Sequence, residues 1–246
     1  NEVVVGGIIT DEQDRPIKQA VVSVLQTDGR HVDWGRTDNA GRYTLALPSA
    51  GRYLVVVSAD GWGPMSGLED LGENYLQEAR QKASRLPGAR WHLIGHLQRN
   101  KVNLAVDLFE TIHTLDSASL IRRLDRRCGE RGRNLPCLIQ IRLGGEDTKH
   151  GVEPAELFDL LDGLREDPPV FLRLVGLMTI PPPGPDPEAS RPHFRYLRSL
   201  LERVLERGYP FWHGRELSMG MSDDYLVAVE EGATMIRVGR AIFGER

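Results

Sequence analysis

The spacing of the apolar residues changes at about residue 64, and this change constrains the fold more than any other feature of the chain. Before it, short β-branched runs alternate with turn residues, and no stretch has an apolar residue every three or four positions. The runs stand at residues 3–9, 20–25, 42–47 and 52–58. Short strands separated by turns at this spacing are typical of a small antiparallel sandwich. We therefore expect an all-β module here.

From about Leu71 onward, strand-sized apolar runs alternate with helical segments. The expected strands are residues 90–95, 111–115, 137–143, 172–180, 216–221 and 235–238. The expected helices are residues 117–131, 154–165, 191–206 and 223–231. Such alternation indicates parallel βαβ units, arranged as a barrel or as a doubly wound sheet. Because residues 60–67 are rich in Gly, Pro and Ser, we predict a β-sandwich over 1–64, a linker over 65–70 and an α/β domain over 71–246.

Composition excludes several classes of function. The 31 Lys and Arg residues are balanced by 35 Asp and Glu residues, so the chain lacks the basic field that nucleic acid binding needs. No apolar run approaches the roughly 20 residues of a membrane helix. The two cysteines, Cys128 and Cys137, match no metal spacing or disulfide framework, which is typical of a reducing compartment. With no readable signal peptide, we expect a cytoplasmic protein without nucleic acid or membrane partners.

A series of specific strings follows one another in the second part of the chain. They are GENY at 72–75, WHLIGHLQRNK at 91–101, IHTLDS at 112–117, GEDTK at 145–149, GLMTIPP at 176–182, LSMGMSDD at 217–224, GATMIRVG at 232–239 and AIFG at 241–244. Together they closely resemble the pyridoxal phosphate homeostasis protein family, over roughly residues 70–246. The resemblance implies a TIM-like barrel of the alanine racemase N-terminal type. It also implies a carrier or buffer of pyridoxal 5′-phosphate (PLP) without catalytic residues.

The resemblance implies a cofactor site at the last two barrel strands, where such barrels often seat a phosphate. Ser222 would follow the seventh strand and start a helix. By resemblance, Ser222, Gly239 and the backbone at Arg240 would hold the phosphate, with Ser218 as a weaker candidate. Arg237 would face the pyridine nitrogen and keep it unprotonated, which suits storage of the cofactor better than catalysis.

Other candidates and alternatives remain open at this point. Asn74 and Lys149 lie inside the family strings and are also candidate cofactor contacts, although a lysine is ordinarily solvated. Ser222 taken alone is better explained as a helix N-cap, because two acidic residues follow it, and only the surrounding string favours the cofactor role. Arg237 could form a salt bridge at the rim of a strand, and Gly239 could serve helix packing.

The histidines suggest no metal site. His92, His96 and His113 lie on different strands or loops, with no paired cysteine or carboxylate at a ligand spacing. We therefore expect structural roles for them and no bound metal. Lys101 lies inside a family string and could face the ligand, although it too is ordinarily solvated.

The resemblance fails at the covalent anchor of the cofactor. In the family, a lysine ends the first barrel strand in a run similar to LVAVSKTKP, whereas this chain has LVVVSADGW at 54–62. If residues 53–58 were the first strand, Ala59 would occupy the lysine's position, and an alanine cannot form an imine. We therefore expect weak, noncovalent PLP binding. The alternative is a structural or interaction protein without a ligand.

The first module resembles the carboxypeptidase regulatory-like domain, a transthyretin-like β-sandwich. The resemblance covers about residues 3–64 and rests on strings such as GIITD at 7–11, TDNAGRYTL at 37–45 and ADGWGP at 59–64. Such modules are accessory. A barrel that lacks its first strand would expose two sheet edges. We therefore hypothesise a chimera in which the last sandwich strand abuts or partly replaces the first barrel strand.

Overall fold

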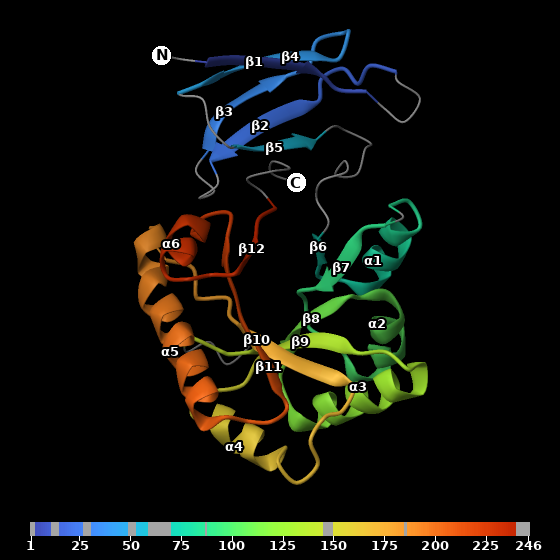
Figure 1. Cartoon of the computed structure of the whole chain (residues 1–246), viewed down its shortest axis with the longest axis vertical. Helices are drawn as coiled ribbons and strands as arrows, with labels where there is room; N and C mark the ends of the chain where they lie inside the picture. The colour runs from blue at the N-terminus through green and yellow to red at the C-terminus, as the bar shows by residue number, and fades with distance from the viewer. Residues whose placement is uncertain are drawn as a thin grey trace. The chain divides into compact units, whose positions relative to one another are not determined.

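The structure is a computed structural model, and it describes residues 3–10, 15–26, 31–48, 53–58, 70–86, 88–144, 150–184 and 186–239. The chain divides into two compact units (Figure 1). Unit 1 consists of Asn1–Leu68 with Val238–Arg246, and unit 2 consists of Glu69–Arg237. The predicted linker at 65–70 lies outside the described residues except for Asp70, which begins the first strand of unit 2.

Unit 1 is built from antiparallel strands, as the alternation of apolar runs predicts. The strands are β1 (Val3–Ile8), β2 (Val21–Gln26), β3 (His31–Arg36), β4 (Arg42–Leu47) and β5 (Tyr53–Ser58). They form a two-stranded sheet, β1-β4, and a three-stranded sheet, β3-β2-β5, consistent with a β-sandwich. The buried core consists of Val22, Val24, Leu45 and Leu47, which come from both sheets.

The chimera hypothesis has the last sandwich strand abut or partly replace the first barrel strand, and the second of these alternatives is wrong. β5 pairs antiparallel with β2 along its whole length, from Val21 opposite Ser58 to Gln26 opposite Tyr53. It therefore belongs to the three-stranded sheet of unit 1 and not to the parallel sheet of unit 2. Ala59, which would occupy the lysine's position, lies outside the described residues.

Unit 2 is an open parallel barrel with helices on its outside (Figure 1). Its strands are β6 (Asp70–Glu73), β7 (Arg90–Leu93), β8 (Thr111–Leu115), β9 (Leu135–Gln140), β10 (Leu172–Met178), β11 (Trp212–Met221) and β12 (Met235–Arg237). They pair in the order β12-β11-β10-β9-β8-β7-β6, and every pair is parallel. Within the described residues, β6 and β12 have no strand beyond them, so the barrel has seven strands and is nearly closed.

The helices of unit 2 alternate with these strands. They are α1 (Leu76–Ala83), α2 (Val102–Leu108), α3 (Ala118–Arg131), α4 (Leu157–Gly163), α5 (Arg191–Arg207) and α6 (Tyr225–Glu230), with 3-10 turns η1 (Arg99–Lys101) and η2 (Pro187–Ser190). α3 illustrates their construction. The hydroxyl of Ser117 accepts a hydrogen bond from the Leu120 N–H at its start, and Gly132 ends it in the left-handed conformation. Four buried residues, Leu120, Ile121, Leu124 and Cys128, lie on the face of the helix that packs on the core.

Several expectations differ from the structure in unit 2. The strand expected at 137–143 is Leu135–Gln140, and the helix expected at 154–165 is Leu157–Gly163. β6, α1 and α2 are not among the expected elements. The last predicted helix, residues 223–231, is shorter than expected. It begins at Tyr225, so Ser222 does not start it.

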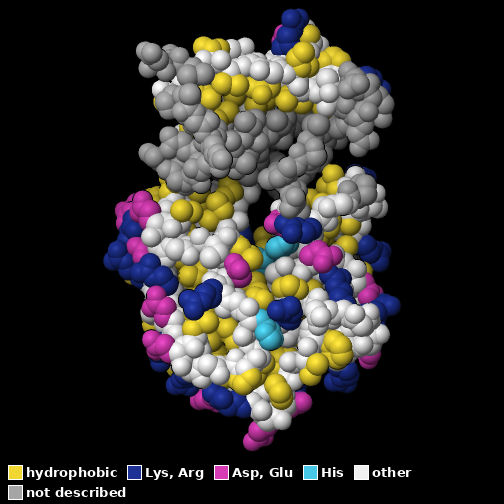
Figure 2. Space-filling model, in the orientation of Figure 1, with side chains coloured by type: hydrophobic (Ala, Val, Ile, Leu, Met, Phe, Trp, Pro, Cys, Tyr) yellow, Lys and Arg dark blue, Asp and Glu magenta, His cyan; other side chains and the backbone are white. Residues whose placement is uncertain are grey.

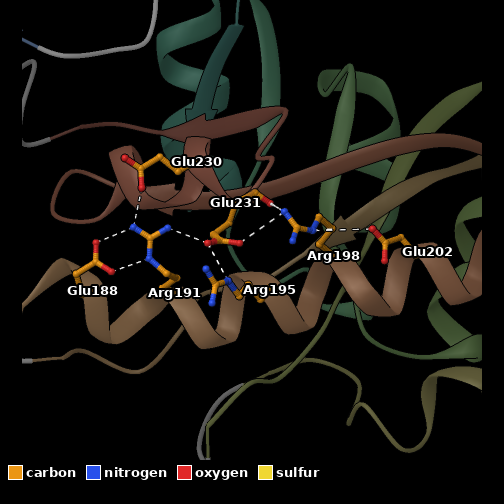
Figure 3. Close-up of polar contacts among 7 residues, drawn as sticks. All are labelled: Glu188, Arg191, Arg195, Arg198, Glu202, Glu230 and Glu231. Carbon is orange, nitrogen blue, oxygen red and sulfur yellow. Dashed lines mark hydrogen bonds and ion pairs between the residues drawn. The ribbon is translucent and has the colours of Figure 1, made fainter.

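An ion-pair network between α5 and α6 holds the end of the barrel in place (Figure 3). Glu231, directly after α6, is buried and accepts hydrogen bonds from Arg191 (2.8 Å) and Arg195 (3.0 Å), both on α5. Arg191 also binds Glu188 and Glu230. The hydrogen bond from Arg191 lowers the pKa of Glu231 below its ordinary value. The helix that follows β11 is therefore attached to the long helix α5 by charge-assisted hydrogen bonds.

Candidate functional site

A cavity of about 270 Å³ lies at the carboxyl ends of the barrel strands, the end where barrels of this class carry their sites. Its walls follow β6, β7, β9 and β10 in the chain. They are formed by Asn74, Ile94, Gly95, His96, Gln140, Ile141, Arg142, Leu143, His150 and Ile180. The cavity lies wholly within unit 2.

Gly95 allows two walls of this cavity to meet. A Cβ at this position would lie 2.1 Å from the Asn74 carbonyl oxygen, which is closer than any side chain tolerates. The Ile94 N–H donates to the Glu73 carbonyl at 3.1 Å, so the pairing of β6 and β7 continues up to this point. The Asn74 N–H in turn donates to Glu73 Oε1 at 2.9 Å. These contacts hold Asn74, a predicted site residue, on the cavity wall.

His113, on β8, is the centre of a chain of hydrogen bonds through the barrel interior. Its Nε2 lies 2.9 Å from Nδ1 of His92 on β7, and its Nδ1 lies 2.8 Å from Oγ of Ser218 on β11. Two strands separate β8 from β11 in the sheet. The contact between His113 and Ser218 therefore exists only because the sheet curls into a barrel.

Arg237, the last residue of β12, extends this chain. Its Nη1 donates to Ser218 Oγ at 2.7 Å, and its Nη2 donates to the Thr179 carbonyl oxygen at 2.7 Å. The predicted site residues Ser218 and Arg237 are thus in direct contact. The alternative role of Arg237, a salt bridge at the rim of a strand, is not observed, because no carboxylate of the described residues lies within ion-pair distance of it.

Asp70 determines the direction of the hydrogen bonds. Its carboxylate is only an acceptor, so the His92 Nε2 at 3.1 Å carries a proton. In neutral His92 the Nδ1 is then an acceptor and receives the Nε2 proton of His113. The Nδ1 of His113 is left as an acceptor for the hydroxyl of Ser218, which itself accepts from Arg237. Every link from Arg237 to Asp70 thus has one donor and one acceptor, with both imidazoles neutral.

Burial keeps the imidazoles of His92 and His113 neutral by lowering their pKa values. It lowers the pKa of His113 to about 3, with a further decrease from His92 and Arg237 nearby. It also lowers the pKa of His92, against an opposing contribution from Asp70. Burial lowers the pKa of Arg237 to about 10, so its guanidinium remains charged at neutral pH. Among the described residues, the charged guanidinium of Arg237 therefore stands at one end of a chain of hydrogen bonds that contains two neutral imidazoles.

Ser222 lies in the turn between β11 and α6. The structure corrects the expectation that Ser222 starts this helix, because Asp224 occupies the N-cap position and accepts from the Met221 N–H at 2.7 Å. Gly220 makes the turn possible. Its φ is +90°, and a Cβ there would lie 2.5 Å from the Cβ of Ala228. The N-cap position of this helix therefore belongs to Asp224 and not to Ser222.

Three other predicted site residues are Gly239, Arg240 and Lys149, of which the structure describes only Gly239. Gly239 is exposed and is grouped with unit 1. A Cβ at Gly239 would meet no atom within 4 Å, so packing among the described residues does not require a glycine there. Arg240 and Lys149 lie outside the described residues.

None of the described barrel strands carries a lysine. The chain has four lysines, at positions 18, 82, 101 and 149. Lys82, on α1, is paired with Glu73 and Glu78, and Lys101 ends η1. No described lysine therefore lies where a barrel strand would present it to the interior.

Sequence reasoning missed the hydrogen-bond partners inside the barrel. His92, His113 and Thr179 were assigned no part in the site, although the two histidines interrupt strands that are otherwise largely apolar. A polar side chain inside such a strand is the signal that could have identified them, since a buried polar group needs a partner.

Comparison with known proteins places both units. The family model of the alanine racemase N-terminal domain matches residues 64–246, and that of the carboxypeptidase regulatory-like domain matches residues 4–68. A pyridoxal phosphate homeostasis protein of Aquifex aeolicus is 43% identical over 185 residues, covering 73% of this chain and 78% of that protein. The human protein of the same name is 38% identical over 191 residues, covering 73% of this chain and 69% of that protein. The chain belongs to the pyridoxal phosphate homeostasis protein family.

Solved structures agree with membership of the pyridoxal phosphate homeostasis protein family. PipY of Synechococcus elongatus without PLP is 40% identical, with a TM-score of 0.65 over 70% of this chain and 80% of that one. PipY with PLP bound has a TM-score of 0.63 with the same coverage. Alanine racemase of Clostridium difficile, 14% identical with a TM-score of 0.58, shares the fold. Among the described helices, none is long and apolar enough to cross a membrane.

Proposed function

We propose that this chain binds PLP noncovalently inside its barrel and holds the cofactor rather than using it in catalysis. The observation that carries the proposal is the guanidinium of Arg237, which is desolvated and has no carboxylate partner among the described residues. Arg237 is half-buried, and the carboxylate of Asp224, which favours its charged form, lies beyond ion-pair distance. A desolvated guanidinium that forms no ion pair is costly unless a ligand supplies acceptors. The pyridine nitrogen and the phosphate of PLP are such acceptors.

In this proposal each residue of the site contacts a different part of PLP. Arg237, oriented by Ser218 and the Thr179 carbonyl, donates a hydrogen bond to the pyridine nitrogen. Asn74 approaches the ring from the cavity wall. Ser222 binds the phosphate from its turn. Gly239 and the backbone at Arg240 remain predicted phosphate contacts.

The same residues favour storage over catalysis. PLP assists catalysis by withdrawing electrons into its pyridine ring, most strongly when the ring nitrogen is protonated. A guanidinium whose pKa is about 10 stays charged near neutral pH and leaves that nitrogen without a proton. The described barrel strands carry no lysine, so they offer no amine that would anchor the aldehyde.

The proposal is tested by thermal unfolding of the full chain with PLP and with pyridoxine 5′-phosphate, which lacks the aldehyde. Both ligands are expected to raise the melting temperature, because noncovalent recognition does not need the aldehyde. At about 100 times the dissociation constant, a ligand stabilises by about 2.7 kcal/mol. Arg237→Gln and Ser218→Ala are expected to reduce the ligand-induced increase, whereas Arg215→Gln, an exposed arginine on β11, is the matched control and should not.

Borohydride reduction followed by mass spectrometry separates noncovalent from covalent binding. We expect no stoichiometric adduct on any of the four lysines. An adduct on Lys149 or Lys101, together with no effect of pyridoxine 5′-phosphate, would refute noncovalent recognition. If neither ligand changes the melting temperature, the interaction protein without a ligand becomes the better interpretation.

We also propose that the protein works in the cytoplasm, with unit 1 as an accessory module. Cys128 and Cys137 are both free thiols, and both are buried. Burial raises the pKa of Cys128 to about 11 and raises the pKa of Cys137 as well, so neither is a reactive thiolate. Unpaired structural cysteines of this kind are typical of a reducing compartment. On the face of unit 2 that Figure 2 shows, basic and acidic side chains are mixed. A surface of this kind argues against nucleic acid as a partner.

A further inference from the structure

Two histidines and an aspartate meet at the carboxyl end of the barrel. His96 follows β7, Asp116 follows β8, and His150 lies in the connection after β9. One ligand atom from each of the three lies within 4.8 Å of the other two. His96 Nδ1 is 3.5 Å from Asp116 Oδ2, and the rings of His96 and His150 stack with centroids 3.5 Å apart and planes 9° apart.

Hydrogen bonds from neighbouring side chains to backbone carbonyls hold the segments that carry these residues. The Thr114 hydroxyl, two residues before Asp116, donates to the Gly95 carbonyl at 2.8 Å and so ties the end of β8 to the loop that carries His96. The carbonyl of His150 accepts from the Gln140 side-chain amide at 2.9 Å. The cluster is therefore assembled by contacts other than those of its own side chains.

The carboxylate of Asp116 presents its two oxygens to different partners. Oδ1 accepts from the Ser117 hydroxyl at 3.0 Å, which leaves Oδ2 facing His96. The ring nitrogens of His150 have no hydrogen bond or ion pair within the described part of the chain. One ring nitrogen of each histidine and one oxygen of a carboxylate that is already oriented therefore lie close enough to share a cation. The lone pairs of the stacked rings lie in nearly parallel planes, so binding requires the imidazoles to rotate toward the ion.

We propose that His96, Asp116 and His150 bind a divalent first-row transition-metal ion such as Zn²⁺. Imidazole nitrogens suit Zn²⁺, Co²⁺, Ni²⁺ and Fe²⁺, and two histidines with one carboxylate are a recurrent ligand set for such ions. Three protein ligands leave at least one coordination position for water or an anion. His96 and His150 line the 270 Å³ cavity, so that position is accessible from it.

The proposal departs from the expectation that the histidines form no metal site. Spacing along the chain cannot reveal this cluster, because its members belong to three successive βα connections. Parallel strands bring their carboxyl ends to one rim, so residues 20 and 34 positions apart in the chain become neighbours.

The test is a titration of the full chain with Co²⁺ after dialysis against a chelator, in the absence of PLP. The visible absorption of Co²⁺ reports its coordination, and Zn²⁺ is then added as a competitor. We expect one saturable Co²⁺ per chain, displaced by Zn²⁺. His96→Ala, Asp116→Asn and His150→Ala are each expected to weaken Co²⁺ binding at least about tenfold.

Two controls keep the result unambiguous. His213→Ala removes an exposed histidine of β11 that is outside the cluster and should bind Co²⁺ as the unmodified chain does. Melting of every variant in chelator shows that it folds, and Asp116→Asn keeps the shape of the side chain. Equal Co²⁺ binding by His96→Ala or His150→Ala and by the unmodified chain would overturn the proposal, as would the absence of saturable binding.

Discussion

Acidification from pH 7 to pH 5 is expected to destabilise the barrel through His113. Burial lowers the pKa of this imidazole to about 3, from 6.5 in an unfolded chain. Between these two values the unfolded state binds a proton that the folded state excludes, so stability falls as the pH decreases below about 6.5. A proton taken up only by the unfolded state at pH 5 costs the fold about 2 kcal/mol relative to pH 7.

The sign is opposite to that of a histidine that gains a carboxylate partner. His113 sits between His92 and Ser218, and neither neighbour offers it a negative charge. The pH range is also chosen to isolate the imidazoles, because the perturbed acids of the chain, such as Glu231, have pKa values below the ordinary 4.5. His92 has a lowered pKa and contributes with the same sign.

The assay is urea unfolding at pH 7, 6 and 5, followed by the fluorescence of Trp91 and Trp212 in unit 2. Trp34→Phe and Trp62→Phe remove the signals from outside unit 2. His113→Asn is expected to be less stable at every pH and to lose most of the decrease between pH 7 and pH 5. His213→Asn should keep the full decrease. The reasoning is refuted if His113→Asn retains the same pH dependence as the unmodified chain.

Two further predictions concern the cavity wall and the α5–α6 network. Gly95→Ala is expected to destabilise by about 1–3 kcal/mol in urea unfolding, because its Cβ would lie 2.1 Å from the Asn74 carbonyl oxygen. Gly163→Ala, where a Cβ meets nothing within 4 Å, should be neutral or stabilising, and equal effects of the two would contradict this account. Glu231→Gln is expected to lower the melting temperature more than Glu202→Gln, because Glu231 is a buried acceptor for several arginines whereas Glu202 is exposed. A larger decrease for Glu202→Gln would show that the network does not hold α6.

Most of the fold could be predicted because its elements are encoded locally. The apolar run at Thr111–Leu115 has the length of a buried strand and is β8 residue for residue. The spacing of Leu120, Leu124 and Cys128 predicts the inner face of α3. The failures are short elements with weak local signals. β6 reads Asp-Leu-Gly-Glu and becomes a strand only because β7 pairs with it.

The candidate site likewise contains residues that the sequence indicates locally and residues that only the tertiary structure brings to it. The strings of the family made Ser218 and Arg237 candidates, and the two side chains are in direct contact. The partners His113 and Thr179 were not foreseen, because they come from strands that are distant in the chain and meet Ser218 and Arg237 only across the curled sheet.

By itself, the sequence determined the two modules, the family of the second and the absence of a lysine from its barrel strands, because these depend on residue identity and local periodicity. Tertiary structure alone decided which polar side chains share one interior. The sheet brings His113 to Ser218 across two intervening strands, and the barrel rim brings His96, Asp116 and His150 together. The physical reason is that curvature and parallel pairing set the distances between strands, and neither is written in the spacing of residues along the chain.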